Sequence, residues 1–537
     1  MKILLINPPA QGANKNLDFS DFILLDKFYM GNDSMPHLGL GYLHAVLLKE
    51  GHDVFTAEMF IQSLNIKDLE RIIEQNNIEL IGSSSYSYNF KSTMQLANSL
   101  KRKYPNIFYI TGGYFPTLAT KPALNNLSVD CCVIGEGEVT VSEIAKKLSN
   151  NHDWRNVDGI AYKNANGDIV INKPRRLIEN LDELPFPNRI FSDVPKLVGI
   201  SSSRGCYGNC NYCSINSFYK KCKGSKARRR SPENTVEEII YLKEKYNFEL
   251  FYFIDDNFGM SSANDRKWFE KFYSLIKEKK ISIQFGIETR ANEVASSFDI
   301  IKKFKEIGLE KVTVGVESFS QAQLDYFNKS ITVNENIEAL KILSSLNIRY
   351  NFNLILFDIR STISEIIKCI EIIKGLDFLF KDGEFHIFYY FTLTLTEGTD
   401  ISEYVKNEKA FANNNHQFKL INEDVKQLHA AIKSWDKKYS LFYAYEFLYE
   451  VSKIVCDNLI TKKLEYLYKS VFKMQIDVLL YACTLAKQNM DSDQIYILLN
   501  ENYNKHIEDY LNQLKILYDI VKKNCRNINN AKQIVEV

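Results

Sequence analysis

Short apolar runs alternate with helical patterns through the first 150 residues of this chain. Each run is followed by a polar or glycine-rich turn and then by residues with helical periodicity. This alternation predicts a parallel sheet with helices on both faces. In such sheets, ligands bind beyond the carboxyl ends of the strands. The runs are Lys2–Ile6, Val54–Ala57, Leu80–Ser83, Ile107–Ile110 and Cys131–Ile134.

A second series of βα units begins at Val198. Six such units predict a partial α/β barrel, whose active site lies at the carboxyl ends of its strands. After residue 400 the strand signals stop, and apolar residues recur at helical spacing only. The later strands of this series are expected at Leu250–Ile254, Ile283–Ile287, Lys311–Val316, Tyr350–Leu356 and Phe385–Tyr389.

The predicted fold class is therefore α/β, with four segments. Residues 1–150 form a Rossmann-like or flavodoxin-like domain, and residues 151–195 form a linker. The linker contains a hairpin turn at Asn164–Asp168 and a stiff extended stretch at Leu184–Asn188. Residues 196–400 form a partial (β/α)6 barrel, and residues 401–537 form an all-helical domain for substrate recognition or packing.

Three cysteines follow the first strand of the second series, as Cys206, Cys210 and Cys213 in the stretch Ser-Arg-Gly-Cys-Tyr-Gly-Asn-Cys-Asn-Tyr-Cys. Three thiolates can hold three corners of a cubic [4Fe–4S] cluster, and the fourth iron then lacks a protein ligand. An open metal position distinguishes a chemical site from a closed structural one. The spacing predicts a redox cluster with these three cysteines as ligands.

Two alternatives for the cysteines are a zinc site and a disulfide. Zinc would need a fourth ligand, for which Cys222 is available, but the paired Cys-x-x-Cys units typical of zinc sites do not follow. A disulfide would need an oxidising compartment. The apolar start of the chain ends at Asn7-Pro8-Pro9, too early for a signal peptide core, and we expect a cytoplasmic protein with reduced thiols.

Charge gives no argument for nucleic acid or membrane partners. Charged residues make up 25% of the chain and its net charge is +1. The basic run Lys226–Arg230 is expected to be a solvated loop before a helix that Ser231 caps. No apolar run approaches the length of a membrane span.

Polar side chains end three of the barrel strands, at Asp255-Asp256-Asn257, Glu288-Thr289-Arg290 and Glu317-Ser318. Each could be a surface carboxylate or a helix cap, but they occur together behind the cysteine loop. A carboxylate can accept hydrogen bonds from an ammonium or from ribose hydroxyls, and an arginine can bind a carboxylate through two bonds.

Both halves of the chain resemble the cobalamin-binding radical S-adenosylmethionine (SAM) enzymes over residues 1 to 400. In the first half the resemblance rests on Asn7-Pro8-Pro9, Pro36–Tyr42, Ser83–Ser87, Gly112-Gly113 and Gly135–Glu138. The linker phrase Leu181–Pro187 is also similar. In the second half it rests on the cysteine loop, Arg230–Pro232, Asp255–Phe258, Gly315–Phe319 and Glu397–Thr399.

The resemblance implies three cofactors: a [4Fe–4S] cluster, SAM and cobalamin. It implies methyl transfer to an unactivated carbon, in which one SAM methylates cobalamin and a second yields the 5′-deoxyadenosyl radical. It also implies a substrate from natural-product or peptide modification and an external electron donor of the flavodoxin or ferredoxin type. The predicted cofactor-binding residues are Asp255, Asp256, Arg290, Glu317, Ser318, Asn7, Pro8, Ser83, Ser85, Tyr86, Gly112, Gly113, Gly135 and Glu136.

Two departures from the family pattern stand out. The loop after the first strand lacks the Asp-x-His-x-x-Gly motif, and His37, His44 and His52 lack its spacing. We therefore predict base-off cobalamin without a histidine ligand, its lower face closed by Tyr86 or Tyr88. The fifth barrel strand also runs into Leu356–Arg360, where family members often have a glycine-proline turn.

Other functions remain open from the sequence. The same cofactors could serve cyclisation, ring contraction or oxidation. The first domain could have lost cobalamin and serve as a substrate-binding or scaffold module. A regulatory iron–sulfur or zinc protein without turnover is a further alternative, against which the acidic strand ends argue.

Overall fold

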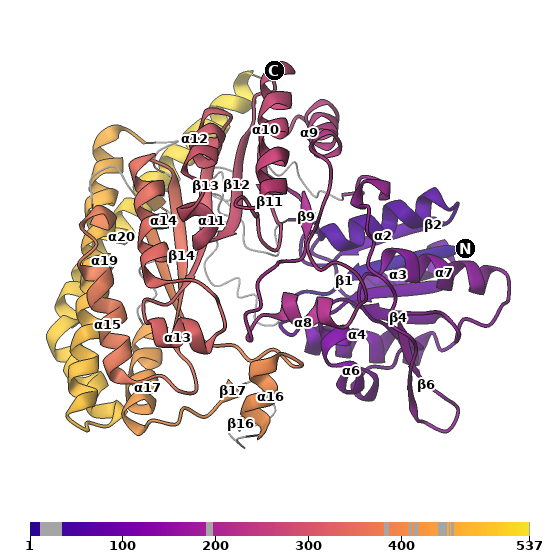
Figure 1. Ribbon diagram of the computed structural model, residues 1–537, viewed down its shortest axis with the longest axis horizontal. Coiled ribbons are helices and arrows are strands. Elements are labelled where there is room, and N and C mark those ends of the chain that lie inside the picture. The colour runs from indigo at the N-terminus through magenta and orange to yellow at the C-terminus, as the bar shows by residue number, and fades with distance from the viewer. Residues whose placement is uncertain are drawn as a thin grey trace.

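The computed structural model describes residues 1–10, 35–189, 197–380, 386–407, 411–412, 417–438, 448–449, 452 and 456–535. Figure 1 shows an amino-terminal α/β domain on the right, a strand-rich barrel next to it and a layer of long helices on the left. The prediction of an α/β chain with a helical carboxyl-terminal part is confirmed.

The first sheet has seven strands in the described part of the chain, in the order β2-β1-β3-β4-β5-β6-β7. Strands β1 to β5 are parallel, and their order 2-1-3-4-5 is that of flavodoxin-like folds. The strands are β1 (Lys2–Asn7), β2 (Asp53–Glu58), β3 (Leu80–Ser84), β4 (Phe108–Gly112), β5 (Cys131–Val133), β6 (Ile160–Lys163) and β7 (Ile169–Ile171).

Helices cover both faces of this sheet because its central strands are apolar on both faces. In β1, Ile3 and Leu5 pack with α2 (Leu38–Lys49) and α7 (Glu138–Ser149). Leu4 and Ile6 point to the opposite face, where they pack with α3 (Ile66–Asn76) and α4 (Phe90–Lys103). Alternation along one strand therefore builds two separate cores. Two short helices, α5 (Tyr114–Leu118) and α6 (Thr120–Asn126), follow β4.

The predicted hairpin at Asn164–Asp168 is present, but its place differs from the expected one. Its strands β6 and β7 are antiparallel and extend the first sheet beyond β5. The first part of the predicted linker thus belongs to the sheet, because β6 pairs with the edge strand β5 and satisfies its backbone groups.

The second sheet has six strands in the described residues, all parallel, in the order β15-β14-β13-β12-β11-β8. This is the predicted partial barrel. Its strands are β8 (Leu197–Ile200), β11 (Leu250–Phe253), β12 (Gln284–Arg290), β13 (Leu309–Glu317), β14 (Arg349–Phe357) and β15 (His386–Thr392). The outer helices are α9 (Pro232–Tyr246), α10 (Ala263–Glu278), α11 (Ala291–Ala295), α12 (Phe298–Glu306), α13 (Gln321–Tyr326), α14 (Val333–Ser345) and α15 (Ile363–Lys374).

The carboxyl-terminal helices pack on the outside of this barrel. Helix α19 (Asn458–Lys487) contacts α15, and α17 (Glu423–Lys438) and α20 (Ser492–Val535) contact α19 and each other. Their buried residues share one hydrophobic cluster with the barrel helices. Figure 1 shows these helices on the side of the barrel away from the first domain. A shorter helix, α16 (Asp400–Asn407), leads to the two-stranded pair β16 (Phe411–Ala412) and β17 (Gln417–Phe418).

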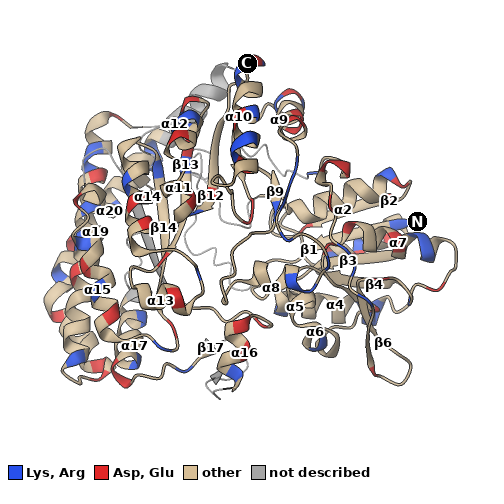
Figure 2. Cartoon of the chain, in the orientation of Figure 1, with Lys and Arg blue, Asp and Glu red and all other residues tan. Residues whose placement is uncertain are grey.

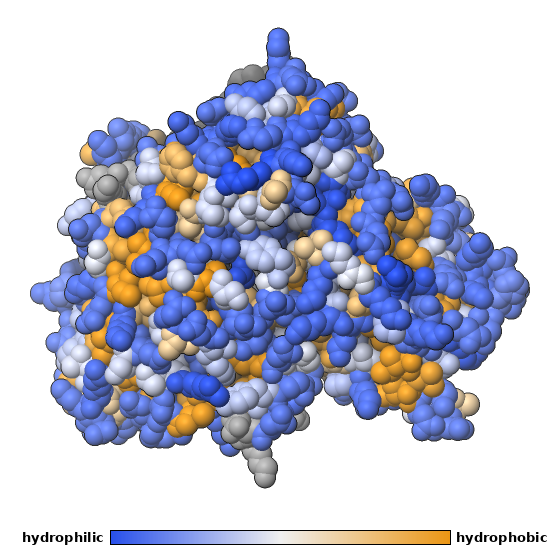
Figure 3. Space-filling view, viewed as in Figure 1, coloured by the Kyte–Doolittle hydropathy of each residue, from blue (hydrophilic) through white to orange (hydrophobic). Residues whose placement is uncertain are grey.

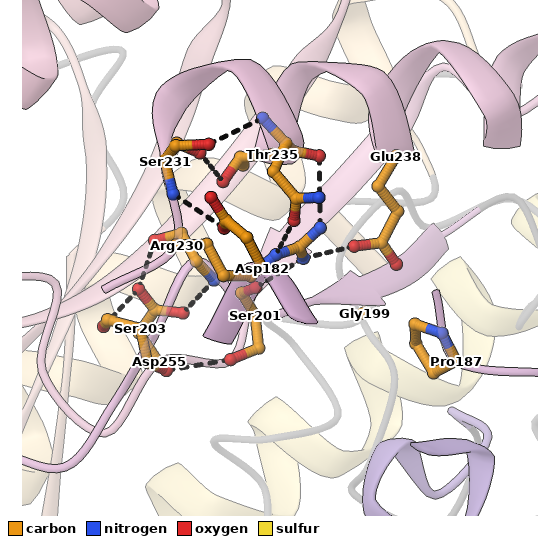
Figure 4. A network of polar contacts seen from close by, with 12 residues as sticks. Asp182, Pro187, Gly199, Ser201, Ser203, Arg230, Ser231, Thr235, Glu238 and Asp255 are labelled. Atoms are coloured by element: carbon orange, nitrogen blue, oxygen red, sulfur yellow. Dashed lines mark hydrogen bonds and ion pairs between the residues drawn. The ribbon is translucent and has the colours of Figure 1, made fainter. Parts of the chain in front are cut away.

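A buried ion-pair group ties the linker to the barrel (Figure 4). Glu238 on α9 is fully buried and accepts from Arg189 of the linker at 2.6 Å and from Arg230. Arg228 is also buried and pairs with Glu136 at 2.9 Å. The prediction of a solvated basic loop at Lys226–Arg230 is therefore wrong for these arginines. Carboxylates from other elements compensate their charges, which a local reading of the run cannot detect.

The surface mixes charges of both signs. In Figure 2, basic and acidic residues alternate along the outer helices. The face in Figure 3 is mostly hydrophilic, with hydrophobic patches scattered among the polar residues. Across the described residues, no helix is both long and apolar enough to cross a membrane.

Candidate active site

A large cavity lies at the carboxyl ends of the first sheet. It encloses about 1190 Å³, including space open to solvent, and we call it the first-sheet cavity. Of the predicted cofactor-binding residues, it is lined by Ser83, Tyr86, Gly112, Gly113, Gly135, Glu136 and Asp256.

Aromatic rings form part of the wall of this cavity. The Tyr86 ring stacks on Tyr88 with centroids 5.1 Å apart and on Tyr114 at 5.6 Å. Tyr114 in turn contacts Phe218 on α8 (Ser214–Lys220), which comes from the second domain. Flat aromatic faces and small glycines in the wall suit a bulky planar ligand.

His37 also lines the first-sheet cavity, but both of its ring nitrogens have partners. Its Nδ1 accepts from the Leu40 N–H at 3.0 Å and thereby caps α2. The proton must then lie on Nε2, which donates to Tyr86 Oη at 2.9 Å. Ser84 Oγ lies 3.1 Å from the same nitrogen. Burial lowers the pKa of His37 to about 4, so the ring is neutral near pH 7.

A second cavity lies at the carboxyl ends of the barrel strands. It encloses about 780 Å³, including open space, and contains all three cysteines of the loop between β9 (Ser203–Arg204) and α8. We call it the cysteine cavity. Its other lining residues include Asn257, Glu288, Thr289, Arg290, Thr313, Glu317, Lys329 and Asn353.

Each cysteine sulfur has a donor beside it. The Gly208 N–H donates to Cys206 Sγ and Arg290 Nη1 donates to Cys210 Sγ, both at 3.3 Å. Burial raises the pKa of Cys213 to about 11, and backbone N–H groups at the start of α8 oppose that rise. Such donors stabilise thiolates, and bound iron would deprotonate the thiols. The residues present therefore fit a thiolate-held cluster.

Cys222 lies apart from the other three cysteines. Its sulfur packs against Gly135 and the side chains around Leu118, Leu177 and Phe218. Among the described residues, no three His, Cys, Asp or Glu side chains converge as ligands of one metal ion would. The placement of Cys222 offers no support for a four-ligand zinc site that includes it.

Charged groups gather beside the cysteines. Lys329 is buried and its Nζ donates to Glu317 Oε1 at 3.0 Å. The guanidinium of Arg290 bonds both Cys210 and the Lys329 carbonyl, which holds it at the edge of the cysteine cavity. A cation pair beside a carboxylate can bind a zwitterion such as the amino acid part of SAM.

Asp256 lines both cavities. Its Oδ2 accepts from the Gly205 N–H at 2.7 Å, at the entry to the cysteine loop. Burial raises the pKa of Asp256 to about 6. The walls of the two cavities therefore share this carboxylate.

Five predicted cofactor-binding residues line neither cavity. Asp255 is buried and accepts from Ser202 and Ser203. Asn7 donates to Glu58, and the Pro8 carbonyl accepts from Asn89. Ser85 and Ser318 are fully buried. Asp255, Asn7 and Pro8 thus have partners within the fold, and a cofactor-binding role for any of the five residues stays a prediction.

The sequence analysis missed several lining residues. They are His37, Tyr114, Glu138, Arg204, Thr313, Lys329 and Asn353. Side chains alternate between the two faces of a strand, so every second residue before a strand end faces the same side. Applying this rule to β13 and β14 could have identified Thr313 and Asn353. Lys329 lies in a loop, and nothing in the local sequence marks it.

Two family models match consecutive parts of the chain. The B12 binding domain matches residues 32–145, and the Radical SAM superfamily matches residues 200–373. These segments contain the first-sheet cavity and the cysteine loop. The chain therefore carries a B12-binding domain followed by a radical SAM domain.

Relatives and solved structures agree with this assignment. An uncharacterised methyltransferase of Pyrococcus horikoshii, PH0819, is 28% identical over 70% of this chain and 78% of its own length. An anaerobic magnesium-protoporphyrin IX monomethyl ester cyclase of Synechocystis is 28% identical, over 65% of this chain and 67% of its own length. The fold is similar to the cobalamin-dependent SAM radical enzyme OxsB with aqua-cobalamin bound, with a TM-score of 0.72, 16% identity and coverage of 99% of this chain and 80% of that one.

For a B12-binding radical SAM enzyme, the two cavities have clear assignments. The family implies cobalamin, a [4Fe–4S] cluster and SAM. The first-sheet cavity has aromatic and glycine walls that suit cobalamin. The cysteine cavity has the thiols for the cluster and the charged groups for SAM. The individual residue contacts stay predictions.

Proposed function

We propose that this enzyme is a methyltransferase that acts on an unactivated carbon of a small molecule or peptide. The closeness of the two cavities, whose walls share Asp256, carries the proposal, because radical formation and methyl delivery must reach one substrate carbon. The similarity to the PH0819 methyltransferase supports it.

When bound, the cluster and SAM supply a radical that abstracts hydrogen, and cobalamin supplies a methyl group. The protein's own residues bind and orient these groups. Cys206, Cys210 and Cys213 hold the cluster, and Arg290 keeps one of them fixed through its bond to Cys210. We propose that Glu317 and Lys329 bind the amino acid part of SAM. An external electron donor of the flavodoxin or ferredoxin type is proposed to reduce the cluster.

The cobalamin is proposed to be base-off without a histidine ligand. His37 supports this, since its two ring nitrogens are held by Leu40, Tyr86 and Ser84. The neighbouring Tyr86 ring is proposed to close the lower face.

A second candidate is ring closure or other radical chemistry without methyl transfer. The similarity to the Synechocystis cyclase favours it. The first domain would then hold cobalamin for a different purpose.

Product analysis separates the two candidates. The anaerobically reconstituted protein is incubated with cobalamin, a strong reductant, methyl-deuterated SAM and a small-molecule extract, and mass spectrometry follows the products. We expect 5′-deoxyadenosine, S-adenosylhomocysteine and a product that carries the deuterated methyl group. A Cys213→Ala variant serves as the control and should yield no 5′-deoxyadenosine. Formation of 5′-deoxyadenosine without S-adenosylhomocysteine would contradict methyl transfer.

A further inference from the structure

An arginine directly before the cysteine loop reaches across to the first domain. Arg204 ends β9, two residues before Cys206. Its Nη1 donates to Glu136 Oε1 at 3.1 Å and its Nη2 donates to Glu138 Oε1 at 2.6 Å. Both acceptors belong to the turn after β5 and the start of α7. One side chain therefore connects the cluster loop to the first sheet.

The contact is buried on both sides. The side chains of Arg204, Glu136 and Glu138 are 14%, 7% and 6% exposed. The other oxygen of Glu136 accepts from Arg228 at 2.9 Å and from the Ile178 N–H at 2.8 Å. Buried ion pairs are stable only in good geometry, so this group holds its members in one arrangement.

The backbone fixes Arg204 as well. Strand β9 pairs antiparallel with β10 (Arg228–Arg229), so that the two arginines that bond Glu136 come from paired strands. The Arg204 guanidinium also lies over the Tyr42 ring, 4.9 Å from its centroid, on helix α2. A displacement of the first domain would break the contacts of Arg204 with Glu136, Glu138 and Tyr42 together.

The same residues line the first-sheet cavity. Tyr42, Glu136, Glu138 and Arg204 all contribute to its wall. A ligand in that cavity would therefore rest against the group that sets the position of the cysteine loop.

We propose that Arg204 is a positioning residue that sets the distance and orientation between cobalamin and the [4Fe–4S] cluster. Its fork of two nitrogens binds two carboxylates of the first domain at once, while its backbone leads into the cluster ligands. Lysine keeps the charge but lacks this fork. The proposal concerns the placement of two cofactors and does not depend on methyl transfer.

Electron paramagnetic resonance tests this, because cob(II)alamin and the reduced cluster are both paramagnetic and their magnetic interaction depends on separation and orientation. The holoenzyme of Arg204→Lys is compared with wild type. We expect full iron content and a cluster signal that still responds to SAM. Cobalamin binding should weaken about tenfold, as for the loss of one charge-assisted hydrogen bond. The magnetic interaction should become weaker and more heterogeneous.

Two further variants make the outcome decisive. Arg175→Lys is the matched control, since Arg175 lies after β7 and pairs with Glu143 on α7, and neither residue lines the first-sheet cavity. It should behave like wild type. Glu138→Gln weakens the ion pair with Arg204 from the side of the first domain and leaves the cysteine loop unchanged. If Arg204→Lys fails to hold iron, the Glu138→Gln variant is the one that tests the proposal. An unchanged magnetic interaction in Glu138→Gln would overturn the proposal, even if cobalamin binding weakens, because Arg204 would then be a wall contact only.

Discussion

His37 shows how hydrogen-bond partners decide what a residue can do. Its position in the wall of the first-sheet cavity would suit a cobalt ligand. However, the Leu40 N–H occupies Nδ1, and the proton on Nε2 points to Tyr86. Ligation through Nε2 would break the Tyr86 contact and move the proton to Nδ1, where it would break the helix cap; ligation through Nδ1 would displace the cap directly. The neutral imidazole, with hydrogen bonds at both nitrogens, therefore holds the Tyr86 side chain in place.

The variant His37→Ala tests this reading at the residue scale. We expect the cob(II)alamin resonance of wild type and variant to lack nitrogen splitting alike. Loss of the cap on α2 should lower the unfolding free energy by about 1 kcal/mol. Electron paramagnetic resonance spectra measure the nitrogen splitting, and thermal unfolding measures the change in stability. His52→Ala, near the amino terminus, is the control. Nitrogen splitting in wild type that disappears in His37→Ala would show histidine ligation instead.

At the scale of elements, the segment from β9 to α8 is built to present three sulfurs. It begins at Gly205, which has a φ of +80°. A Cβ atom there would lie 1.9 Å from the Lys226 carbonyl oxygen, so only glycine fits. The segment ends where α8 begins at Ser214, directly after Cys213. The loop conformation is thus fixed at both ends.

Cysteine substitutions test this element. Cys210→Ala should lose the cluster and all reductive SAM cleavage, because one iron loses its ligand. Cys222→Ala should keep both, since its sulfur lies outside the cysteine cavity. Iron analysis and 5′-deoxyadenosine formation measure these outcomes. Bound zinc in the wild type that Cys222→Ala removes would refute the cluster assignment.

At the scale of the whole molecule, buried ion pairs join parts that are distant in sequence. Arg204 and Arg228 of the barrel bind Glu136 of the first domain, and Arg189 of the linker binds Glu238 on α9. The helical layer has a different role, since it shares one apolar core with the outer barrel helices. Its described part supports packing, and its use in substrate recognition stays a prediction.

Glu238→Gln tests the junction between linker and barrel. Two buried arginines would lose their counter-charge, and we expect the unfolding free energy to fall by about 3–5 kcal/mol. Glu233→Gln on the same helix is the matched control. Glu233 is half exposed and 3.7 Å from Lys271, so its loss should cost roughly 0–1 kcal/mol. Chemical denaturation measures both. Equal effects of the two variants would contradict a special role for the buried group.

Local patterns in the sequence were enough to predict both sheets, the helical end and the cysteine loop. Alternating apolar runs follow from burial on two faces, and the cysteine spacing follows from the chemistry of a cluster. The family resemblance implied Ser83, Tyr86, Gly112, Gly113, Gly135 and Glu136 as cofactor-binding residues, and these six residues line the first-sheet cavity.

Only the tertiary structure decided which polar residues face a cavity and which support the fold. Asp255 and Asp256 are neighbours with the same side chain, yet the first bonds Ser202 and Ser203 while the second lines both cavities. Successive residues of an extended segment point to opposite sides, and the partners on each side come from distant strands. The arginines after Lys226 are buried for the same reason, because Glu136 is 92 residues from Arg228. The sequence by itself determined the elements and the spacing of the three cysteines in their loop, and long-range partners determined the walls of the site.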